Sequence, residues 1–346
     1  MISCLDWGMG HATRCVPIIE KLLSEGNTIF LAGSEVQHQL FKSYFSNHVY
    51  YLISPSYSIS YSRRIPLFIS VLLQMPKIFI VKRMENFWLR RMVKDKNIEV
   101  IISDNRFGMY NKRIQSIYIT HQLNVKTPYK LNLAKLWHQR IMKNYNEIWV
   151  PDSPDGISGE LTSPVSSTLP PVKLIGILSA LRPTFCKKKE NQILVLLSGP
   201  EPQRGILEEK LLRVFNQVEL PYQFVMVCGN LNNSSETNKD TKVKRVDWVS
   251  GSELSKLIEE SRLIVCRSGY STLMDLCVFG SSALLIPTPG QTEQEYLAQH
   301  CSSKFGIPFL TQNNLTEDCL KTSIEEAMKH RFPVLSFDLY KSKVKI

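Results

Sequence analysis

The sequence predicts an α/β protein made of two Rossmann-like domains that face a cleft. Three observations support this fold class. Short apolar runs rich in β-branched residues alternate with helical patterns in both halves of the chain, which is typical of parallel sheets. A segment rich in proline and serine separates the two halves. The length of 346 residues suits two domains of about 150 residues each.

Residues 1–150 form the first predicted domain. Its expected strands cover residues 2–5, 28–31, 100–103 and 117–120. Between the first two strands, Val16, Ile19 and Leu22 recur at helical spacing, and Glu25-Gly26 ends that helix. A strand, a helix and a parallel strand in this order predict a right-handed βαβ unit.

Residues 151–190 are expected to connect the domains, because prolines accumulate there with serine and glycine before the basic run at 187–189. Residues 191–330 repeat the alternation and form the second predicted domain. Its expected strands cover residues 193–197, 224–227, 263–265 and 283–286. Residues 331–346 are expected to be a tail that packs back on the N-terminal domain.

Composition narrows the class of partner. The formal net charge of +11 attracts phosphate-bearing partners, which include nucleic acid, an anionic membrane and a diphosphate substrate. None of the usual nucleic-acid-binding modules is present, so we expect no nucleic acid partner. The eight cysteines are scattered and form no Cys-x-x-Cys pair, which favours a reducing, cytoplasmic setting. We expect neither a signal peptide nor a membrane-spanning helix.

The most informative segment follows the expected strand at 263–265. Arg267, Ser268 and Gly269 come at the strand end and open a helix, whose unpaired N–H groups would bind an anion. Ser271 and Thr272 add hydroxyl donors, and the carboxylate of Asp275, one turn further, suits a ribose diol. At the next helix start, Gln294 and Glu295 suit sugar hydroxyls. The alternative is that Ser-Gly merely caps a helix and that Asp275 is a solvated surface acid.

Residues 262–300 resemble the C-terminal domain of glycosyltransferase family 28. That family has Arg-Ser-Gly at this strand end, an acidic residue six positions after the glycine, and a glutamine-rich helix start after a proline-containing loop. The resemblance implies the two-Rossmann glycosyltransferase fold, GT-B, and a UDP-sugar donor. It implies that Asp275 binds the ribose, that residues 268–271 lie near the diphosphate, and that Gln294 and Glu295 hold the sugar. Glu295 stands where the family usually has glutamine, so the donor sugar stays open between N-acetylglucosamine and a related hexose.

Two further segments fit this resemblance, which is clearest over residues 190–300. Ser198 lies in the loop after the second domain's first strand, where the family has a Gly-rich loop that touches the phosphates. Arg204 in the same region would neutralise the diphosphate. Trp248 and Val249 match the position whose backbone reads the uracil edge, although Trp248 suits a plain core residue equally well.

The N-terminal loop supplies the candidate chemistry. Gly8, Gly10 and His11 resemble the family's N-terminal Gly-Gly-His loop on the acceptor side. An inverting transfer needs a base for the acceptor hydroxyl, and we predict His11 as that base. Asp104, after the strand at 100–103, is predicted to orient the imidazole. His121 resembles the family's acceptor-side histidine, although a histidine hydrogen-bonded within a loop is an equally good interpretation.

We expect neither a cofactor nor a metal ion. The sequence contains no Asp-x-Asp, the carboxylate pair that usually holds a divalent ion on a nucleotide-sugar. The histidines outside positions 11 and 121 form no recognisable ligand set. The charge on the departing diphosphate would then be met by a helix N-terminus, hydroxyls and cationic side chains.

Residues 63–91 form a candidate membrane face. Arginine and lysine are interleaved there with isoleucine, leucine, phenylalanine and tryptophan, the pattern of a helix at an anionic lipid surface. The family resemblance implies such peripheral membrane contact and an acceptor that is lipid-linked or belongs to a cell-envelope glycan. The alternative is a buried helix pair with a solvated basic face.

Three functions therefore remain open at the level of sequence. The first is an inverting, metal-independent hexosyltransferase that uses a UDP-sugar. The second is an isomerase similar to the UDP-N-acetylglucosamine 2-epimerases, which share the two-Rossmann fold. The third is a non-catalytic nucleotide-sugar-binding protein.

Overall fold

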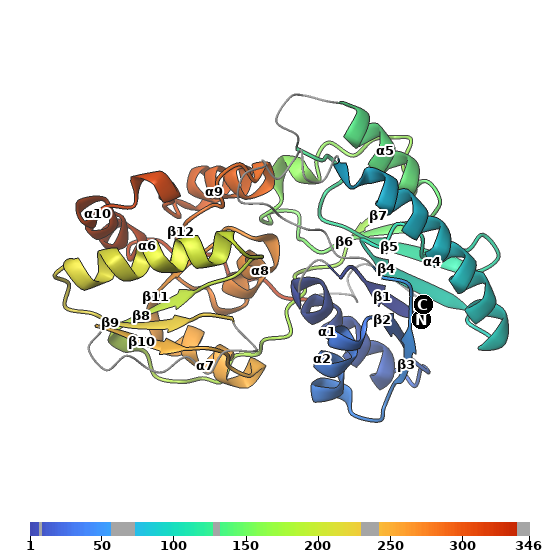
Figure 1. The fold of residues 1–346 in the computed structure, drawn as a ribbon, viewed down its shortest axis with the longest axis horizontal. Helices are drawn as coiled ribbons and strands as arrows, with labels where there is room; N and C mark the ends of the chain where they lie inside the picture. The colour runs from blue at the N-terminus through green and yellow to red at the C-terminus, as the bar shows by residue number, and fades with distance from the viewer. Residues whose placement is uncertain (7–8, 57–72, 127–131, 230–241, 338–346) are drawn as a thin grey trace. The chain divides into compact units, whose positions relative to one another are not determined.

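A computed structural model describes residues 1–6, 9–56, 73–126, 132–229 and 242–337, with the side chains of 132–134 left out. The described residues form two compact units (Figure 1). The N-terminal unit contains the described residues up to 180 together with 336–337, and the C-terminal unit contains those from 181 to 335.

The N-terminal unit is built on a parallel sheet with the strand order β3-β2-β1-β4-β5-β6-β7. Its strands are β1 (Ile2–Cys4), β2 (Phe30–Gly33), β3 (Tyr50–Ile53), β4 (Val100–Asp104), β5 (Gln115–Ile119), β6 (Glu147–Val150) and β7 (Val172–Leu174). The strand order reverses its direction at β1 and β4, the topological switch point at which doubly wound sheets bind their ligands.

Helices cover both faces of this sheet. They are α1 (Met9–Ser24), α2 (Glu35–Phe45), α4 (Met75–Asp95) and α5 (Asn132–Met142), with a 3₁₀ turn at Gly159–Leu161. Helices α1 and α2 pack on each other, and α4 and α5 lie side by side elsewhere on the sheet (Figure 1). The α4 residue Leu89 belongs to the same core cluster as Ala32 of β2 and Ile101 of β4.

The C-terminal unit has a second parallel sheet with the order β10-β9-β8-β11-β12. Its strands are β8 (Lys189–Leu196), β9 (Gln223–Val227), β10 (Val243–Val246), β11 (Ser261–Cys266) and β12 (Ala283–Leu285). Its helices are α6 (Gln203–Gln217), α7 (Gly251–Glu260), α8 (Tyr270–Phe279), α9 (Thr292–Phe305) and α10 (Glu317–Ala327), with a 3₁₀ turn at Gln312–Asn314.

The core of this unit explains the arrangement of its helices. Inward-facing residues such as Ile193 of β8 and Leu263 of β11 share a cluster with Leu211 of α6 and Leu320 of α10. Helix α8 ends at Gly280, whose φ of 56° is left-handed and whose Cβ position would lie 2.7 Å from Val334 Cγ2. A glycine is therefore required where this helix ends.

The predicted α/β class with two Rossmann-like sheets is confirmed. Each strand expected from the sequence overlaps a strand of the structure, whereas β3, β6, β7 and β10 were not anticipated. Strand β7 lies within the segment expected as a connector and pairs with β6 in parallel. At the other end of the chain, Phe337 forms an isolated antiparallel bridge with Gly176, so the described part of the C-terminal tail contacts the N-terminal unit.

Candidate functional site

The N-terminal candidate site lies where α1 begins, beside the carboxyl ends of β4 and β5. His11 lies in the first turn of α1, and Asp104 is the last residue of β4. The Nδ1 atom of His11 lies 3.2 Å from Asp104 Oδ1. The His11 side chain is 21% exposed, whereas Asp104 is fully buried. The predicted contact between these two residues is therefore present.

Arg14 completes this cluster and was missed by sequence reasoning. Its Nε atom donates to Asp104 Oδ2 at 2.6 Å, its Nη2 atom donates to Asp104 Oδ1, and its Nη1 atom lies 3.3 Å from His121 Nδ1. Arg14 follows His11 by three residues, so the two side chains lie on the same face of α1. That three-residue spacing is the sequence signal that could have identified this arginine.

The charges of this cluster determine its protonation. Burial alone would raise the pKa of Asp104, but the positive charge and hydrogen bonds of Arg14, with those of His11, lower it well below its usual range. Burial lowers the pKa of His11, and the charge of Arg14 lowers it further, while Asp104 partly opposes both. Asp104 is therefore ionised and His11 neutral at neutral pH.

The other acceptor-side predictions lie near this cluster or outside the described residues. His121 follows β5, is 5% exposed and contacts Arg14. Gly10 lies in the first turn of α1, and its carbonyl accepts a hydrogen bond from the Thr13 hydroxyl. Gly8 lies outside the described residues.

The C-terminal candidate site lies at the carboxyl edge of the second sheet. Because β8, β11 and β12 are parallel, their carboxyl ends lie along one edge, where α6, α8 and α9 begin. Gly269 caps α8, and a Cβ atom placed on it would lie 3.9 Å from Gln294 Nε2 and from Thr272 Oγ1. The starts of α8 and α9, far apart in the sequence, are therefore neighbours in the fold.

Two of the predicted donor residues are built into the walls of this site. Arg267 is 1% exposed, and its guanidinium donates to the carbonyls of Ile286, Pro287 and Gln203 and to Gln312 Oε1 at 2.7–3.2 Å. Ser268 is fully buried and donates its hydroxyl to the Gln294 carbonyl at 2.7 Å. These bonds hold the ends of β11 and β12 against the starts of α6 and α9.

The side chains of α9 hold the loop that precedes them. Gln294 Oε1 accepts from the Thr288 N–H at 2.9 Å, and Glu295 Oε1 accepts from the Gly290 N–H at 2.8 Å. While this oxygen is bonded to the loop, the amide nitrogen of Gln294 lies near the start of α8. Ser271, Thr272 and Asp275 are half-buried on α8, so Asp275 is not a fully solvated surface acid.

The remaining donor predictions lie on loops or at the start of a helix. Arg204, at the start of α6, forms an ion pair with Glu201 at 2.8 Å and donates to the Gly229 carbonyl at 2.8 Å. Ser198 follows β8 and is half-buried. Trp248 is 53% exposed, so the interpretation of Trp248 as a core residue was wrong, whereas Val249 beside it is half-buried.

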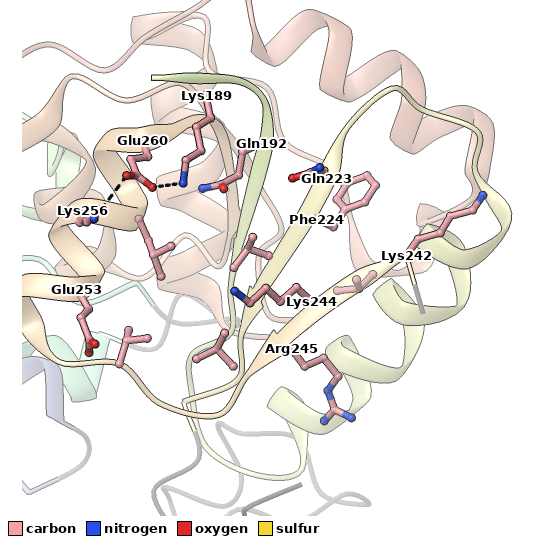
Figure 2. Close-up of a pocket in the computed structure, with 15 residues that line it drawn as sticks. Lys189, Gln192, Gln223, Phe224, Lys242, Lys244, Arg245, Glu253, Lys256 and Glu260 are labelled. Carbon is pink, nitrogen blue, oxygen red and sulfur yellow. Dashed lines mark hydrogen bonds and ion pairs between the residues drawn. The ribbon is translucent and has the colours of Figure 1, made fainter. Parts of the chain in front are cut away.

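A groove of about 800 Å³ lies over the same sheet, beside α7 (Figure 2). Lys242, just before β10, Lys244 of β10 and Lys256 of α7 line it, and Glu260 pairs with Lys189 at 2.6 Å. Of the predicted donor residues, it includes Val249 alone. The groove is therefore distinct from the sheet edge at which the other predicted donor residues gather.

The described residues contain no cluster of three or more histidine, cysteine, aspartate or glutamate residues able to hold a metal ion. No helix in the described ranges is both long and apolar enough to cross a membrane. All eight cysteines lie in described ranges and are free thiols.

The two doubly wound sheets define the class of two-Rossmann glycosyltransferase folds, GT-B. The glycotransferase of kitacinnamycin has a TM-score of 0.66 at 15% identity, covering 94% of this chain and 89% of that one. MurG from Acinetobacter baumannii has a TM-score of 0.61 at 14% identity, covering 96% of this chain and 95% of that one. At these identities the similarity shows the fold.

Within that class, residues 202–333 match the model of the glycosyltransferase family 28 C-terminal domain. A relative from Clostridium perfringens (strain SM101 / Type A) is the UDP-N-acetylglucosamine--N-acetylmuramyl-(pentapeptide) pyrophosphoryl-undecaprenol N-acetylglucosamine transferase. It is 23% identical over 150 residues, which are 42% of this chain and 42% of that protein. The chain thus matches less than half the length of this curated relative. The family 28 resemblance, expected most clearly over residues 190–300, is confirmed, and the match covers residues 202–333.

Proposed function

We propose that this chain is an inverting, metal-independent glycosyltransferase. It transfers a hexose, N-acetylglucosamine or a related sugar, from a UDP-sugar to a hydroxyl of an acceptor. The observation that carries the proposal is the match of residues 202–333 to the family 28 C-terminal domain, with the starts of α8 and α9 at one sheet edge. Two curated relatives, which match 150 and 165 residues of this chain, are transferases by name.

The donor is assigned to the carboxyl edge of the second sheet. The N-terminus of α8, where the helix dipole is positive, and the Gln294 amide nitrogen beside Gly269 are suited to bind the diphosphate or the sugar. Asp275, on the same helix, accepts hydrogen bonds from the ribose hydroxyls. The exposed Trp248, with Val249, borders the uracil, while Arg267 and Ser268 hold the loops in place.

His11 acts as the base. The acceptor oxygen attacks the anomeric carbon from the face opposite the diphosphate, and its proton passes to His11 Nε2. The new carbon–oxygen bond forms as the bond to UDP breaks, which inverts the configuration. A neutral imidazole whose Nδ1 faces an ionised carboxylate is suited to this step.

The exposed side chains of α4 support the proposal that the acceptor is lipid-linked and that the protein lies at the inner face of the cytoplasmic membrane. The exposed apolar residues of this helix are Phe79, Ile80, Met84 and Phe87, and its exposed basic residues are Lys77, Arg83, Arg90, Arg91 and Lys94. Leu136 of α5 is also exposed, beside Trp137, whose ring contacts Phe79. Apolar and basic side chains on one helix surface suit the interface of an anionic membrane. The predicted residues 63–72 lie outside the described residues.

The test is calorimetry with UDP, followed by incubation of the chain with UDP-N-acetylglucosamine and related UDP-hexoses. We expect the chain to bind UDP and, without acceptor, to release UDP slowly by hydrolysis of the UDP-sugar. His11→Ala should still bind UDP but should no longer release it from the UDP-sugar. Absence of UDP binding at millimolar ligand would overturn the proposal. Formation of the 2-epimer would favour the isomerase, and binding without release under any acceptor mixture would favour a non-catalytic binding protein.

A further inference from the structure

Arg14 contacts three atoms of the N-terminal site at once, although its own side chain is only 2% exposed. Its guanidinium spans both oxygens of Asp104 and reaches His121 Nδ1. A guanidinium carries only donors and stays protonated in proteins. Each of its neighbours must therefore present an acceptor to it, and this requirement determines where the protons of the site lie.

The same logic fixes the tautomer of His11. Asp104 is a buried carboxylate that already accepts from Arg14, so it presents only acceptor atoms to its neighbours. The His11 Nδ1 atom, 3.2 Å away, must then carry the ring proton. A neutral His11 protonated at Nδ1 has its lone pair at Nε2, where a base is required.

His121 is held in the opposite tautomer. Its Nδ1 atom lies 3.3 Å from a guanidinium nitrogen and must therefore be the acceptor. The neutral ring then carries its proton at Nε2. That atom lies 3.5 Å from the side-chain amide of Gln122, whose oxygen and nitrogen are interchanged by a simple flip. His121 thus offers an N–H donor where His11 offers a lone pair.

We propose that Arg14 is a positioning residue that sets opposite tautomers in the two histidines, making His11 a base at Nε2 and His121 a hydrogen-bond donor at Nε2. The catalytic meaning of this arrangement rests on the proposed transferase function, since His11 takes the acceptor proton and His121 holds a substrate oxygen. The tautomers themselves follow from the contacts of Arg14 and require no substrate.

The tautomers assigned to His11 and His121 must also be compatible with the other groups around the two rings. Cys15 Sγ lies 3.8 Å from Asp104 Oδ2, so it too contacts the carboxylate as a donor. His138 of α5 interacts electrostatically with His121, and burial lowers the pKa of His138 to about 4. His138 is therefore neutral, and Arg14 provides the fixed positive charge that faces both rings.

The experiment is long-range ¹H–¹⁵N NMR of ¹⁵N-histidine-labelled full-length protein without ligand. His11→Gln and His121→Gln spectra assign the two rings, and the other histidines serve as internal references. We expect Nδ1–H in His11 and Nε2–H in His121. Arg14→Lys keeps the charge beside Asp104 but loses the fork, so we expect His11 to stay Nδ1–H while His121 becomes a mixture of tautomers.

The proposal is overturned if wild-type His121 carries its proton at Nδ1, or if His121 keeps a single Nε2–H tautomer in a folded Arg14→Lys protein. The wild-type result stands even where Arg14 variants do not fold. Under the proposed function, Arg14→Lys should lower kcat by roughly 10- to 100-fold with the donor KM unchanged, as expected for a residue that orients a functional one. If the protein shows these tautomers but no transferase activity, the proposed function is wrong and the tautomer assignment still holds.

Discussion

At the residue scale, Asp104 accepts hydrogen bonds on both carboxylate oxygens while its side chain is fully buried. An unpaired carboxylate in this position would be expensive to ionise. The guanidinium of Arg14 compensates for the lost hydration, so the carboxylate keeps its charge and can orient His11. Arg14 thereby makes His11 less basic than a simple His–Asp pair would.

The first prediction concerns the pH dependence of transfer. His11 must be neutral to accept a proton, and its pKa is lowered from the ordinary value of 6.5 by burial, Arg14 and His121, against the opposing effect of Asp104. The acidic limb of kcat should therefore lie below pH 6.5, with activity lost only as the pH falls through the lowered pKa.

Arg14→Met removes a positive charge beside His11 and should move this acidic limb to higher pH. The measurement is kcat against pH for both proteins at saturating donor, with the exposed substitution Arg91→Met as the control. An acidic limb that is the same in all three proteins would contradict the assignment of His11 as the base that Arg14 influences.

The second prediction concerns Asp275. Asp275→Asn keeps the size of the side chain but removes its charge, so hydrogen bonds from the ribose diol should weaken. Bonds to charged groups contribute about 1.5–3 kcal/mol, which corresponds to a loss in UDP affinity of roughly 10- to 100-fold. For 2′,3′-dideoxy-UDP, a deoxy analogue that lacks both ribose hydroxyls, calorimetry should find similar affinities for the wild-type and Asp275→Asn proteins.

Asp318→Asn, on the exposed start of α10, is the matched control for this experiment. Equal losses of affinity for UDP and for its deoxy analogue would show that Asp275 acts on something other than the ribose.

At the scale of elements, α4 has a buried polar side chain on its inner face and exposed apolar side chains on its outer face. Glu85 and Arg106 form an ion pair at 2.9 Å with side chains 1% and 2% exposed. Arg106 also donates to Ser54 Oγ at 2.8 Å, and Glu85 Oε2 accepts from the Gly108 N–H at 2.8 Å. The pair therefore ties α4 to the loops that follow β3 and β4.

The third prediction is that Arg106→Met lowers the free energy of unfolding by about 3–5 kcal/mol, because it leaves Glu85 buried without its partner. Adding Glu85→Gln should recover part of this loss, since the uncompensated charge is gone. Urea unfolding measures both. Arg91→Met, which removes an exposed i,i+4 pair with Asp95, should cost no more than about 1 kcal/mol. Similar losses for the two arginines would refute a special role for the buried pair.

The fourth prediction concerns the outward face of α4. Phe87 is 78% exposed and Ile80 is 60% exposed. The double substitution Ile80→Ser and Phe87→Ser should weaken binding to vesicles that contain anionic lipid by roughly 10-fold or more, because two apolar side chains no longer enter the interface.

Co-sedimentation with vesicles measures this binding, and Val36→Ser with Val334→Ser provides an equally exposed control pair. UDP affinity should be unchanged in all variants. Vesicle binding that persists after the double substitution on α4 would place the membrane contact elsewhere.

At the scale of the whole molecule, the proposed mechanism, with the donor at the second sheet and the base on α1, needs no metal ion. The fifth prediction is that EDTA leaves both UDP affinity and the rate of UDP release unchanged, because helix N-termini and neutral donors meet the charge of the diphosphate. Adding Mg²⁺ or Mn²⁺ after chelation should also have no effect. A rate that falls with EDTA and returns with either ion would disprove metal independence.

Much of the fold was predictable from local patterns. Buried parallel strands such as β8, β11 and β12 contain continuous apolar runs and are therefore conspicuous in a sequence. Strands β3 and β10 escaped prediction because they lie at sheet edges and carry exposed residues such as Tyr50 and Lys244. Strand β7 is only three residues long and follows a proline pair, so nothing local marks it as a strand.

The candidate sites show the same division. The position of Ser268, Gly269 and Asp275 at a strand end and helix start was predictable because these segments are contiguous in the chain. The buried, internal hydrogen bonds of Arg267 were not predictable, since its partners come from α6, the end of β12 and the 3₁₀ turn at Gln312–Asn314.

By itself, the sequence determined the two-Rossmann class, the resemblance of the C-terminal half to family 28 and the residues that open α1, α8 and α9. These features depend on periodicity and on residues adjacent in the chain. Only the tertiary structure decided that Arg14 joins Asp104 and His121, that Arg267 is buried as a strut, and that Trp248 is exposed. The physical reason is that burial, charge and protonation depend on neighbours contributed by distant segments, which a linear pattern does not contain.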